Sequence, residues 1–178
     1  MSSQLAPTPV LTTDRLTLRG PALGDLDTFV EFYTSDRSAY VGGPLTKDAA
    51  WRLFATEIGH WHLRGFGMWT VTLNGDDTAL GMVGCWYPDG WPEREVGWLL
   101  WPDAEGKGFA FEAAQAALTH AFGTLGWHTA VSYIDAPNTR SVALAERLGA
   151  TLDKAARTPE FDDGAEVLVY RHLSPEAA

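Results

Sequence analysis

Residues 95–122, EVGWLLWPDAEGKGFAFEAAQAALTHAF, combine three local patterns in direct succession. The first seven residues form an apolar run that ends at Pro102, which is typical of a buried β-strand. Residues 105–110, EGKGFA, form a turn with two glycines. From Ala110 onward, small or apolar residues recur at the i, i+3, i+4, i+7 spacing of an amphipathic helix. The stretch therefore predicts a strand, a glycine turn and a helix.

The glycine turn has the chemistry of a phosphate-binding site. The first turn of a helix leaves backbone N–H groups unpaired, and the helix dipole favours negative charge there. Gly106 and Gly108 have no Cβ, so a ligand can approach the backbone closely. The turn is not a P-loop, which requires Gly-Lys-Ser/Thr, and Phe111 stands where the dinucleotide fingerprint has its third glycine. Taken alone, the turn is equally compatible with a structural connection.

Three segments together resemble the GNAT (Gcn5-related) N-acetyltransferases, in the branch that includes the ribosomal-protein N-terminal acetyltransferases. EVGWLL followed by GKGFAFEA is similar to the acetyl-CoA-binding motif of that family. Residues 138–141 (NTRS) and 145–150 (AERLGA) are similar to its Asn-x-x-Ser helix and Leu-Gly ending. Residues 13–19 (TDRLTLR) resemble the opening strand of this branch. The three segments span nearly the whole chain in the order of the family.

The resemblance implies one domain over residues 1–178, of the α/β (α+β) class. We expect a mixed, twisted sheet of about seven strands with helices on both faces. The expected strands cover residues 15–19, 67–73, 79–86, 95–101, 131–134, 151–157 and 167–173. The expected helices cover residues 24–33, 46–64, 110–122 and 138–149, and a polar turn at 161–164 precedes the last strand. The periodicity without the resemblance supports only a mixed α/β domain.

Composition and charge exclude several classes of protein. The net charge is −10 and the basic residues are scattered, which argues against nucleic-acid binding and favours cationic substrates such as amines. No apolar run approaches the ~18 residues of a membrane span, and residues 1–10 lack the pattern of a signal peptide. Cys85 is the single cysteine, so no internal disulfide is possible. We expect a cytoplasmic monomer or homodimer without nucleic-acid or membrane partners.

The sequence contains no pattern typical of a metal site or of a serine hydrolase. His60 and His62 are two residues apart on an expected helix, so they point to different faces, and the other histidines show no ligand spacing. No Gly-x-Ser-x-Gly motif is present. Cys85 is expected to be a small buried hydrophobic residue rather than a catalytic thiol. We therefore expect no metal.

The resemblance implies acetyl-CoA as co-substrate, bound between the strand from Glu95 and the strand from His128, which are expected to separate at a bulge near Leu99. The backbone of residues 99–101 would pair with the pantetheine arm, and the N–H of Leu100 would hold the thioester oxygen. The implied cofactor-binding residues are Leu99, Leu100, Trp101, Gly106, Lys107, Gly108, Phe109, Ala110, Asn138 and Ser141.

Coenzyme A is a polyanion and the chain is acidic, so positive charge must be concentrated around the glycine turn. Lys107, Arg140 and Arg147 are the candidates for local positive charge. Glu105 departs from the family pattern, in which Gln or Arg begins the turn. A carboxylate beside a pyrophosphate is unfavourable by roughly 1 kcal/mol when solvated. Either Glu105 points away from the phosphates or affinity for coenzyme A is weakened.

Direct acetyl transfer to a primary amine requires a base and a proton donor, because amines with pKa values of about 8–10 are mostly protonated at neutral pH. The resemblance implies Glu95 as the base, acting through water, with Glu93 as the nearby rival. It implies Ser141 as the proton donor, with Tyr133 as a second candidate. The alternative for Glu95 is a solvated carboxylate at a strand end. Asn138 is a natural helix N-cap whatever its further role.

The acceptor stays open between a protein N-terminus, an aminoglycoside-like drug, a polyamine and an amino acid. Trp86, Tyr87 and Trp91 flank a turn, where they either line an acceptor pocket or cover the sheet edge. Residues 35–44 form either a lid or an ordinary connection. Two other functions are compatible with the sequence. One is a non-catalytic acyl-CoA sensor of the same fold, and the other is a phosphate- or nucleotide-binding protein that uses the glycine turn.

Overall fold

The computed structural model describes residues 7–159, 164 and 166–177. Its centre is an eight-stranded sheet in the order β1-β2-β3-β4-β5-β6-β8-β7. The strands are β1 (Leu11–Thr12), β2 (Leu16–Arg19), β3 (Met68–Leu73), β4 (Gly81–Trp86), β5 (Glu95–Leu100), β6 (Thr129–Asp135), β7 (Thr151–Leu152) and β8 (Val167–Leu173). The pairing of β5 with β6 is parallel and the other pairings are antiparallel. The strand beyond the expected seven is β1, whose two residues are too few to give a pattern.

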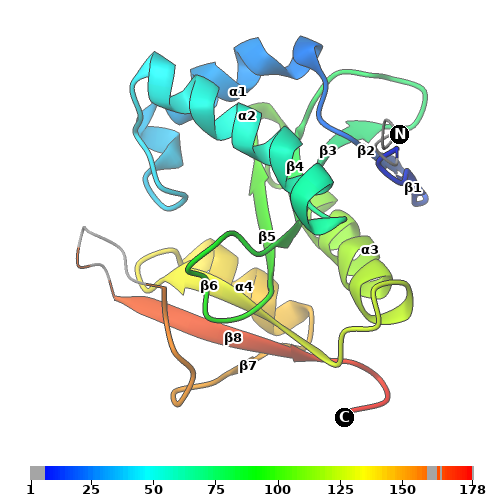
Figure 1. Ribbon diagram of the computed structural model, residues 1–178, viewed down its shortest axis with the longest axis vertical. Helices are drawn as coiled ribbons and strands as arrows, with labels where there is room; N and C mark the ends of the chain where they lie inside the picture. Colours follow the sequence, from blue (N-terminus) through cyan, green and yellow to red (C-terminus); the bar gives the residue numbers. More distant parts are fainter. Residues whose placement is uncertain (1–6, 160–163, 165, 178) are drawn as a thin grey trace, which may run out of the picture.

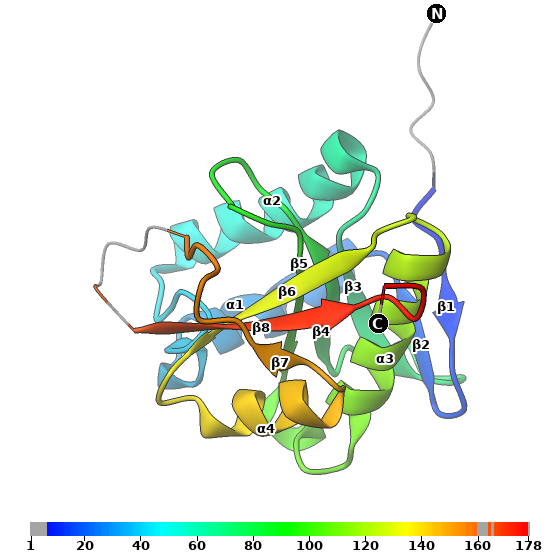
Figure 2. The ribbon, with the colours of Figure 1, turned by 90° about the horizontal axis from the view of Figure 1, so that it is seen from below.

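Helices cover both faces of the sheet, as predicted. Helices α1 (Leu26–Tyr33) and α2 (Lys47–Arg64) pack on one face, and α3 (Phe109–Gly123) and α4 (Thr139–Arg147) pack on the other (Figures 1 and 2). The described structure also contains the short 3-10 helices η1 (Leu23–Asp25), η2 (Asp36–Ser38) and η3 (Pro102–Ala104). The mixed α/β fold expected from the sequence is therefore confirmed.

The helix boundaries follow from capping chemistry. The Thr46 side chain accepts a hydrogen bond from the N–H of Ala49 at the start of α2, and Gly65, with a φ of +77°, ends that helix. The Asn138 side chain accepts from the N–H of Ser141 at the start of α4. The strand expected over residues 151–157 stops at Leu152, because the Asp153 carboxylate turns the chain by accepting from the N–H of Ala155. Residues 161–163 of the expected polar turn lie outside the described residues.

The two faces of the sheet bury different kinds of side chain. On the α3 face, a stripe of four fully buried alanines lets the helix approach the strands closely: Ala113, Ala114, Ala117 and Ala121. On the opposite face, the rings of Phe29, Phe32, Tyr33 and Phe54 pack with Met68, Met82 and Trp101. Cys85 is fully buried in β4, where burial raises the pKa of its thiol to about 12, so the thiol stays neutral as expected.

The sheet opens between its parallel strands. Strand β5 pairs with β4 along its whole length, but it pairs with β6 only where Glu95 faces Val131. The register of β5 with β4 is continuous across Leu99, so the bulge expected near Leu99 is absent from this described strand pair. The opening arises instead because β6 turns away from β5. In Figure 1 the two strands diverge below the α1–α2 layer. Main-chain groups of β5 beyond Glu95 therefore lack a strand partner on this side.

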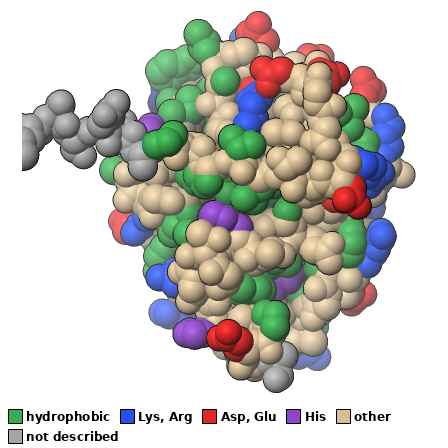
Figure 3. Space-filling model, turned by 90° about the vertical axis from the view of Figure 1, so that its right-hand side faces the viewer, with side chains coloured by type: hydrophobic (Ala, Val, Ile, Leu, Met, Phe, Trp, Pro, Cys, Tyr) green, Lys and Arg blue, Asp and Glu red, His purple; other side chains and the backbone are tan. Residues whose placement is uncertain are grey.

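Surface charge agrees with the acidic composition. On the face shown in Figure 3, acidic and basic side chains lie next to each other around the margin and form no single basic patch in that view. Among the described residues, no helix is both long and apolar enough to cross a bilayer.

Candidate active site

Two adjoining cavities lie where β5 and β6 separate. The large cavity, about 490 Å³, extends from β5 and β6 to the α1–α2 layer, and its lining includes Glu57, Trp86, Trp91, Glu95, Tyr133 and Asp135. The small cavity, about 200 Å³, lies beside the glycine turn, and its lining includes Arg37, Leu100, Glu105, Gly106, Ala110 and Arg140. The shared wall consists of Tyr40, Val41, Trp98, Leu99, Asn138 and Ser141. Two of the sequence segments with the family resemblance, the strand and glycine turn from Glu95 and the segment 138–141, thus line one continuous site.

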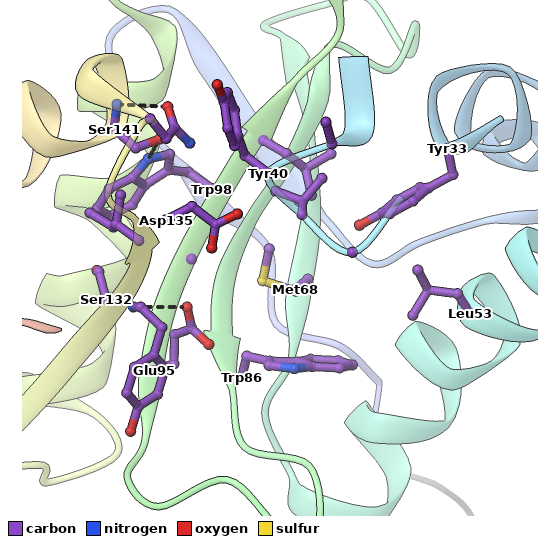
Figure 4. Close-up of a pocket in the computed structure, with 18 of the residues that line it drawn as sticks. Tyr33, Tyr40, Leu53, Met68, Trp86, Glu95, Trp98, Ser132, Asp135 and Ser141 are labelled. Atoms are coloured by element: carbon purple, nitrogen blue, oxygen red, sulfur yellow. Dashed lines mark hydrogen bonds between the residues drawn. The ribbon is translucent and has the colours of Figure 1, made fainter. Parts of the chain in front are cut away.

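Glu95 stands at the start of β5 with its carboxyl group in the large cavity (Figure 4). The Trp91 indole N–H donates to Oε2 at 2.8 Å, and the backbone N–H of Tyr133 donates to Oε1 at 3.3 Å. Burial raises the pKa of Glu95 to about 7, although these two hydrogen bonds oppose the shift. The expected alternative, a solvated carboxylate at a strand end, does not match this environment. A carboxyl group with this pKa exchanges protons readily near neutral pH.

The two rival residues lie in different environments. Both oxygens of Glu93 form ion pairs with the Arg171 guanidinium, at 2.8 Å each, and hydrogen bonding to Arg171 keeps the pKa of Glu93 below its usual value. Glu93 is not part of the described lining of either cavity. Tyr133 does line the large cavity, and burial raises the pKa of its hydroxyl to about 12.

Ser141 lies on the wall between the two cavities, in the first turn of α4. Its Oγ accepts a hydrogen bond from the Trp98 indole N–H at 3.2 Å, and its backbone N–H donates to Asn138 Oδ1 at 3.3 Å (Figure 4). Because the Oγ lone pair is engaged by Trp98, the hydroxyl proton of Ser141 is left to donate elsewhere. Trp98, which also packs against the hydrophobic core, therefore orients this hydroxyl.

The glycine turn adopts the backbone that its sequence requires. Gly106 and Gly108 have φ values of +74° and +79°, in the left-handed region, and Gly108 is the N-cap of α3. Arg15 braces the turn from the first strands: its Nη1 donates to the carbonyl of Lys107 at 3.0 Å, and its guanidinium lies over the Phe109 ring. The Phe109 ring is buried and the Lys107 side chain is exposed outside both cavity linings. The bracing by Arg15 has no sequence signal, because 92 residues separate it from Lys107.

The three residues at the end of β5 expected to face the pantetheine arm, Leu99, Leu100 and Trp101, differ in direction. Trp101 directly follows β5, its N–H donates to the carbonyl of Leu80, which directly precedes β4, and its ring is in the core. On the other edge of β5, the carbonyl of Val96 accepts from Ser132 Oγ at 2.6 Å. Because strand residues alternate, the backbone of Leu99 faces β4, whereas that of Leu100 faces the opening toward β6. The backbone N–H and C=O of Leu100 therefore lie on the strand edge that faces the opening. Leu99 is part of the lining of both cavities.

Glu105 is held between two arginines. Arg140 Nη1 donates to its Oε2 at 2.6 Å, and Arg37, from η2, forms an ion pair with its Oε1. Partial burial opposes ionisation, but these hydrogen bonds lower the pKa of Glu105, so it is a carboxylate at neutral pH. Arg140 thus lines the small cavity as expected, whereas Arg147 lies over the Phe111 ring. Arg37 is a basic residue of this site that the sequence analysis did not identify.

The aromatic residues near the large cavity have distinct positions. Trp86 and Trp91 line it, whereas the Tyr87 ring lies under the Arg64 guanidinium. His60 stacks on Trp86 with ring centroids 4.4 Å apart, and its two nitrogens bond to the backbone of Phe66 and Tyr87. His60 is thus a structural residue. Within the described part of the chain, no group of three or more His, Cys, Asp or Glu residues is arranged to hold a metal ion.

The sequence analysis missed Glu57 as a site residue. It lies among the apolar residues of α2 and is 5% exposed, on the wall of the large cavity. A signal was present, since Glu57 is the one acidic residue on the side of that helix that carries Ala50, Phe54 and Trp61. The residues 39–42, from the connection between α1 and α2, complete the same wall.

The fold and the site define a class of protein. A sheet that opens at a parallel pair of strands, with a glycine turn at a helix N-terminus on one side and a carboxyl group on the other, is the architecture of acyl-CoA-dependent N-acyltransferases. The family model described as "Acetyltransferase (GNAT) domain" matches residues 15–151. The chain belongs to the GNAT acetyltransferase family and is an acyltransferase, as its sequence motifs predicted.

Individual relatives agree with this assignment. The chain is 28% identical over 142 residues to an uncharacterized N-acetyltransferase, YnaD, of Bacillus subtilis (strain 168), covering 78% of this chain and 81% of that protein. An acetyltransferase structure from Agrobacterium tumefaciens str. C58 is 38% identical, with a TM-score of 0.88 over 98% of this chain and 99% of that one. Spermidine N-acetyltransferase from Vibrio cholerae, solved in complex with CoA and spermine, is 21% identical, with a TM-score of 0.73 over 90% and 96% of the two chains, and shares the fold.

Proposed function

We propose that this protein transfers the acetyl group of acetyl-CoA to a primary amine by direct attack, with Glu95 as the base. The observation that carries the proposal is the Glu95 carboxyl group, held by Trp91 in the cavity where β5 and β6 separate, with a pKa raised to about 7. Such a group can accept a proton from an ammonium ion, through water, at neutral pH. The rival base Glu93 is disfavoured because Arg171 occupies both of its oxygens.

The small cavity fits acetyl-CoA by the chemistry of its donors. The N–H groups that begin α3, at Phe109 and Ala110, with the left-handed Gly106 and Gly108, suit the pyrophosphate. Arg140 and Arg37 supply positive charge beside them. The free edge of β5 at Leu100 suits the amide groups of the pantetheine arm, and the Asn138 side chain lies on the shared wall. Bound acetyl-CoA supplies the activated acyl group.

Residues of the shared wall and of the strands beside it complete the reaction. As the neutral amine attacks the thioester carbon, negative charge develops on the thioester oxygen, where the Leu100 N–H is the proposed donor. The carbon–sulfur bond then breaks, and the thiolate leaves toward Ser141. Because Trp98 donates to its Oγ, the Ser141 hydroxyl proton is available to hydrogen-bond the sulfur, and the thiolate takes up a proton from solvent relayed through this hydroxyl, which regains its own proton in the same transfer. Tyr133 is the alternative proton donor, from the opposite strand β6.

The test is an acceptor screen with acetyl-CoA, in which free thiol is detected and the product is identified by mass spectrometry. We expect thiol release only with an amine present and no acetylated enzyme in its absence. Glu95→Gln should abolish most of the turnover, whereas the matched variant Glu93→Gln should retain it. Binding of coenzyme A without turnover of any amine would indicate a sensor of the same fold. A melting-temperature increase with ATP or NAD and none with coenzyme A would indicate a nucleotide-binding protein.

A further inference from the structure

The lining of the large cavity includes a buried carboxyl group that the proposed reaction does not use. Glu57 is 5% exposed, and its Oε2 has no hydrogen-bond partner among the described residues. Burial raises the pKa of this carboxyl group to about 8. An unpaired polar group is costly to bury, and a cationic ligand in the cavity that Glu57 lines would supply the missing partner once the carboxyl group turns toward it.

Glu57 and Glu95 lie on opposite walls of this cavity. Glu57 is on α2, one turn after Leu53, whereas Glu95 is on β5. In Figure 4, Leu53 and Tyr33 lie on the side of the α1–α2 layer, and Glu95 and Ser141 lie on the side of β5, β6 and α4. The Tyr33 hydroxyl points into the space between them. A ligand whose reactive nitrogen is near Glu95 therefore extends toward Glu57.

The space between the two carboxyl groups is apolar. Leu53, Met68 and Trp86 lie around it in Figure 4 and belong to the cavity lining. The Trp86 ring is fixed there because His60 stacks on it at an interplanar angle of 17°. Such walls suit a short hydrocarbon chain or ring. The middle of such a ligand has no hydrogen-bond donor or acceptor that would be left unpaired there.

The charge of the cavity selects the ends of that ligand. Its described lining contains three carboxyl groups, at Glu57, Glu95 and Asp135, and no Lys, Arg or His. A carboxylate on the ligand would find no cation to pair with, whereas an ammonium ion would favour the ionised form of the carboxyl group that it reaches on either wall. A peptide N-terminus would bring an amine to Glu95, but its chain would place an uncharged peptide backbone, rather than a cation, beside Glu57.

We infer that Glu57 is a specificity-determining residue that binds the second, protonated amine of a compact diamine acceptor. The inference rests on the proposed acetyl transfer. The first amine loses a proton through Glu95 and forms the new nitrogen–carbon bond as the carbon–sulfur bond breaks, and the thiolate takes up a proton. The second amine stays protonated on Glu57, which gives up its own proton to solvent when the ammonium ion binds. The apolar body of the diamine lies between Leu53, Met68 and Trp86.

The experiment compares three acceptors of equal length: a straight-chain diamine, the corresponding monoamine, and the amine with a terminal hydroxyl group. With wild-type enzyme, KM for the diamine should be lower than for the other two. Glu57→Gln should raise KM for the diamine about 10- to 100-fold, because a buried charge-assisted hydrogen bond is lost, and should leave kcat and both other KM values within about threefold. Glu31→Gln, on the exposed side of α1, is the matched control and should leave all values unchanged.

Coenzyme A binding by Glu57→Gln, measured calorimetrically, establishes that the variant is folded. Diamine binding to wild-type enzyme at pH 7 should also release protons, measured from the dependence of binding enthalpy on the buffer, and Glu57→Gln should lose this release. Equal KM values of wild-type enzyme for diamine and monoamine, or turnover of a peptide N-terminus alone, would overturn this inference and leave the acetyl transfer standing. Absence of turnover with every amine would overturn both.

Discussion

The large and the small cavity share a wall at Trp98 and Ser141, yet they shift the pKa values of glutamate side chains in opposite directions. In the large cavity, burial raises the pKa values of Glu57 and Glu95 to about 8 and about 7. In the small cavity, Arg37 and Arg140 lower the pKa of Glu105. Three glutamates within one site therefore differ in charge at neutral pH, because burial governs Glu57 and Glu95 and two arginines govern Glu105. The difference separates a region suited to proton transfer and cations from a region suited to anions.

The largest expected effect comes from removing the base of the large cavity. Glu95→Gln should reduce kcat/KM by roughly 10²–10⁴ at pH 7, because the amine then lacks a proton acceptor. In the wild-type enzyme, the rate should rise with pH through about 7, as the Glu95 carboxylate forms. The variant should lack this rise, and its deficit should shrink near the pKa of the acceptor, where free amine arrives already deprotonated. Steady-state rates from pH 6 to pH 10 measure both effects.

The Glu93→Gln variant controls for the loss of a nearby carboxylate. Its rate should stay close to that of the wild type, although loss of the ion pair with Arg171 lowers its melting temperature. A Glu95→Gln enzyme with wild-type turnover and an unchanged pH profile would eliminate the role of Glu95. A loss of turnover that is equal at every pH would indicate that Glu95 positions the ammonium ion instead.

The second effect is a pH dependence of protein stability that arises from Glu57. Its pKa is about 8 in the folded protein and near its usual value in the unfolded chain. Between these values the folded protein holds a proton that the unfolded chain has lost, so wild-type stability should fall as pH rises, by about 1.4 kcal/mol per pH unit at most. Glu57→Gln removes this dependence. The variant should melt higher than the wild type at pH 9, and the gap should close toward pH 5.

Thermal unfolding of the unliganded protein at several pH values provides the measurement, with Glu31→Gln as the control. The control should follow the wild-type curve, since Glu31 is exposed. If Glu57→Gln and the wild type show the same pH dependence, Glu57 is ionised in the folded protein, and the contrast between the two cavities is lost.

The third effect tests the anion side of the comparison. Ala110→Asp adds a carboxylate to the first turn of α3, in the lining of the small cavity. It should weaken coenzyme A binding about 10- to 100-fold by calorimetry, which corresponds to about 1.4–2.7 kcal/mol. An acidic residue in the first turn of a helix favours the helix, so the fold should persist. Ala110 is a better site than Gly108, whose φ of +79° would strain any other residue.

Gln115→Asp is the charge-matched control, because it adds the same charge at an exposed position further along α3. It should leave the dissociation constant within about twofold, and pantetheine should bind both variants as it binds the wild type. Equal weakening of coenzyme A by the two substitutions would show a general charge effect and remove the first turn of α3 from the phosphate site.

The sequence predicted the parts of this site that local patterns encode. The strand from Glu95, the glycine turn, the cap at Asn138 and the buried Cys85 all follow from spacing and residue type. The departure of β6 from β5 has no local signal, so the expectation that the Leu100 N–H serves the opening came from the family resemblance and not from the pattern of the strand itself. The two cavities likewise depend on tertiary packing.

Pairs distant in sequence account for most of what sequence analysis missed. Glu105 meets Arg37 across 68 residues, and Arg15 meets Lys107 across 92. Each residue alone is an ordinary surface charge in the sequence. Glu57 is the exception: a glutamate among apolar residues of a helix is visible in the sequence. The packing of α1 on α2, however, determines that it is buried with its Oε2 unpaired among the residues that the structure describes.

The smallest effect concerns Glu105, whose carboxylate competes with phosphate for the same two guanidinium groups. Glu105→Gln frees Arg37 and Arg140 and removes a negative charge beside the pyrophosphate. Since partly exposed ion pairs contribute at most about 1 kcal/mol, coenzyme A affinity should rise by about threefold to fivefold. Pantetheine affinity should not change, and dephospho-coenzyme A separates contacts to the pyrophosphate from contacts to the 3′-phosphate. A fall in coenzyme A affinity would mean that Glu105 holds the arginines in place for the phosphates, and the small cavity would then need its carboxylate as much as the large one does.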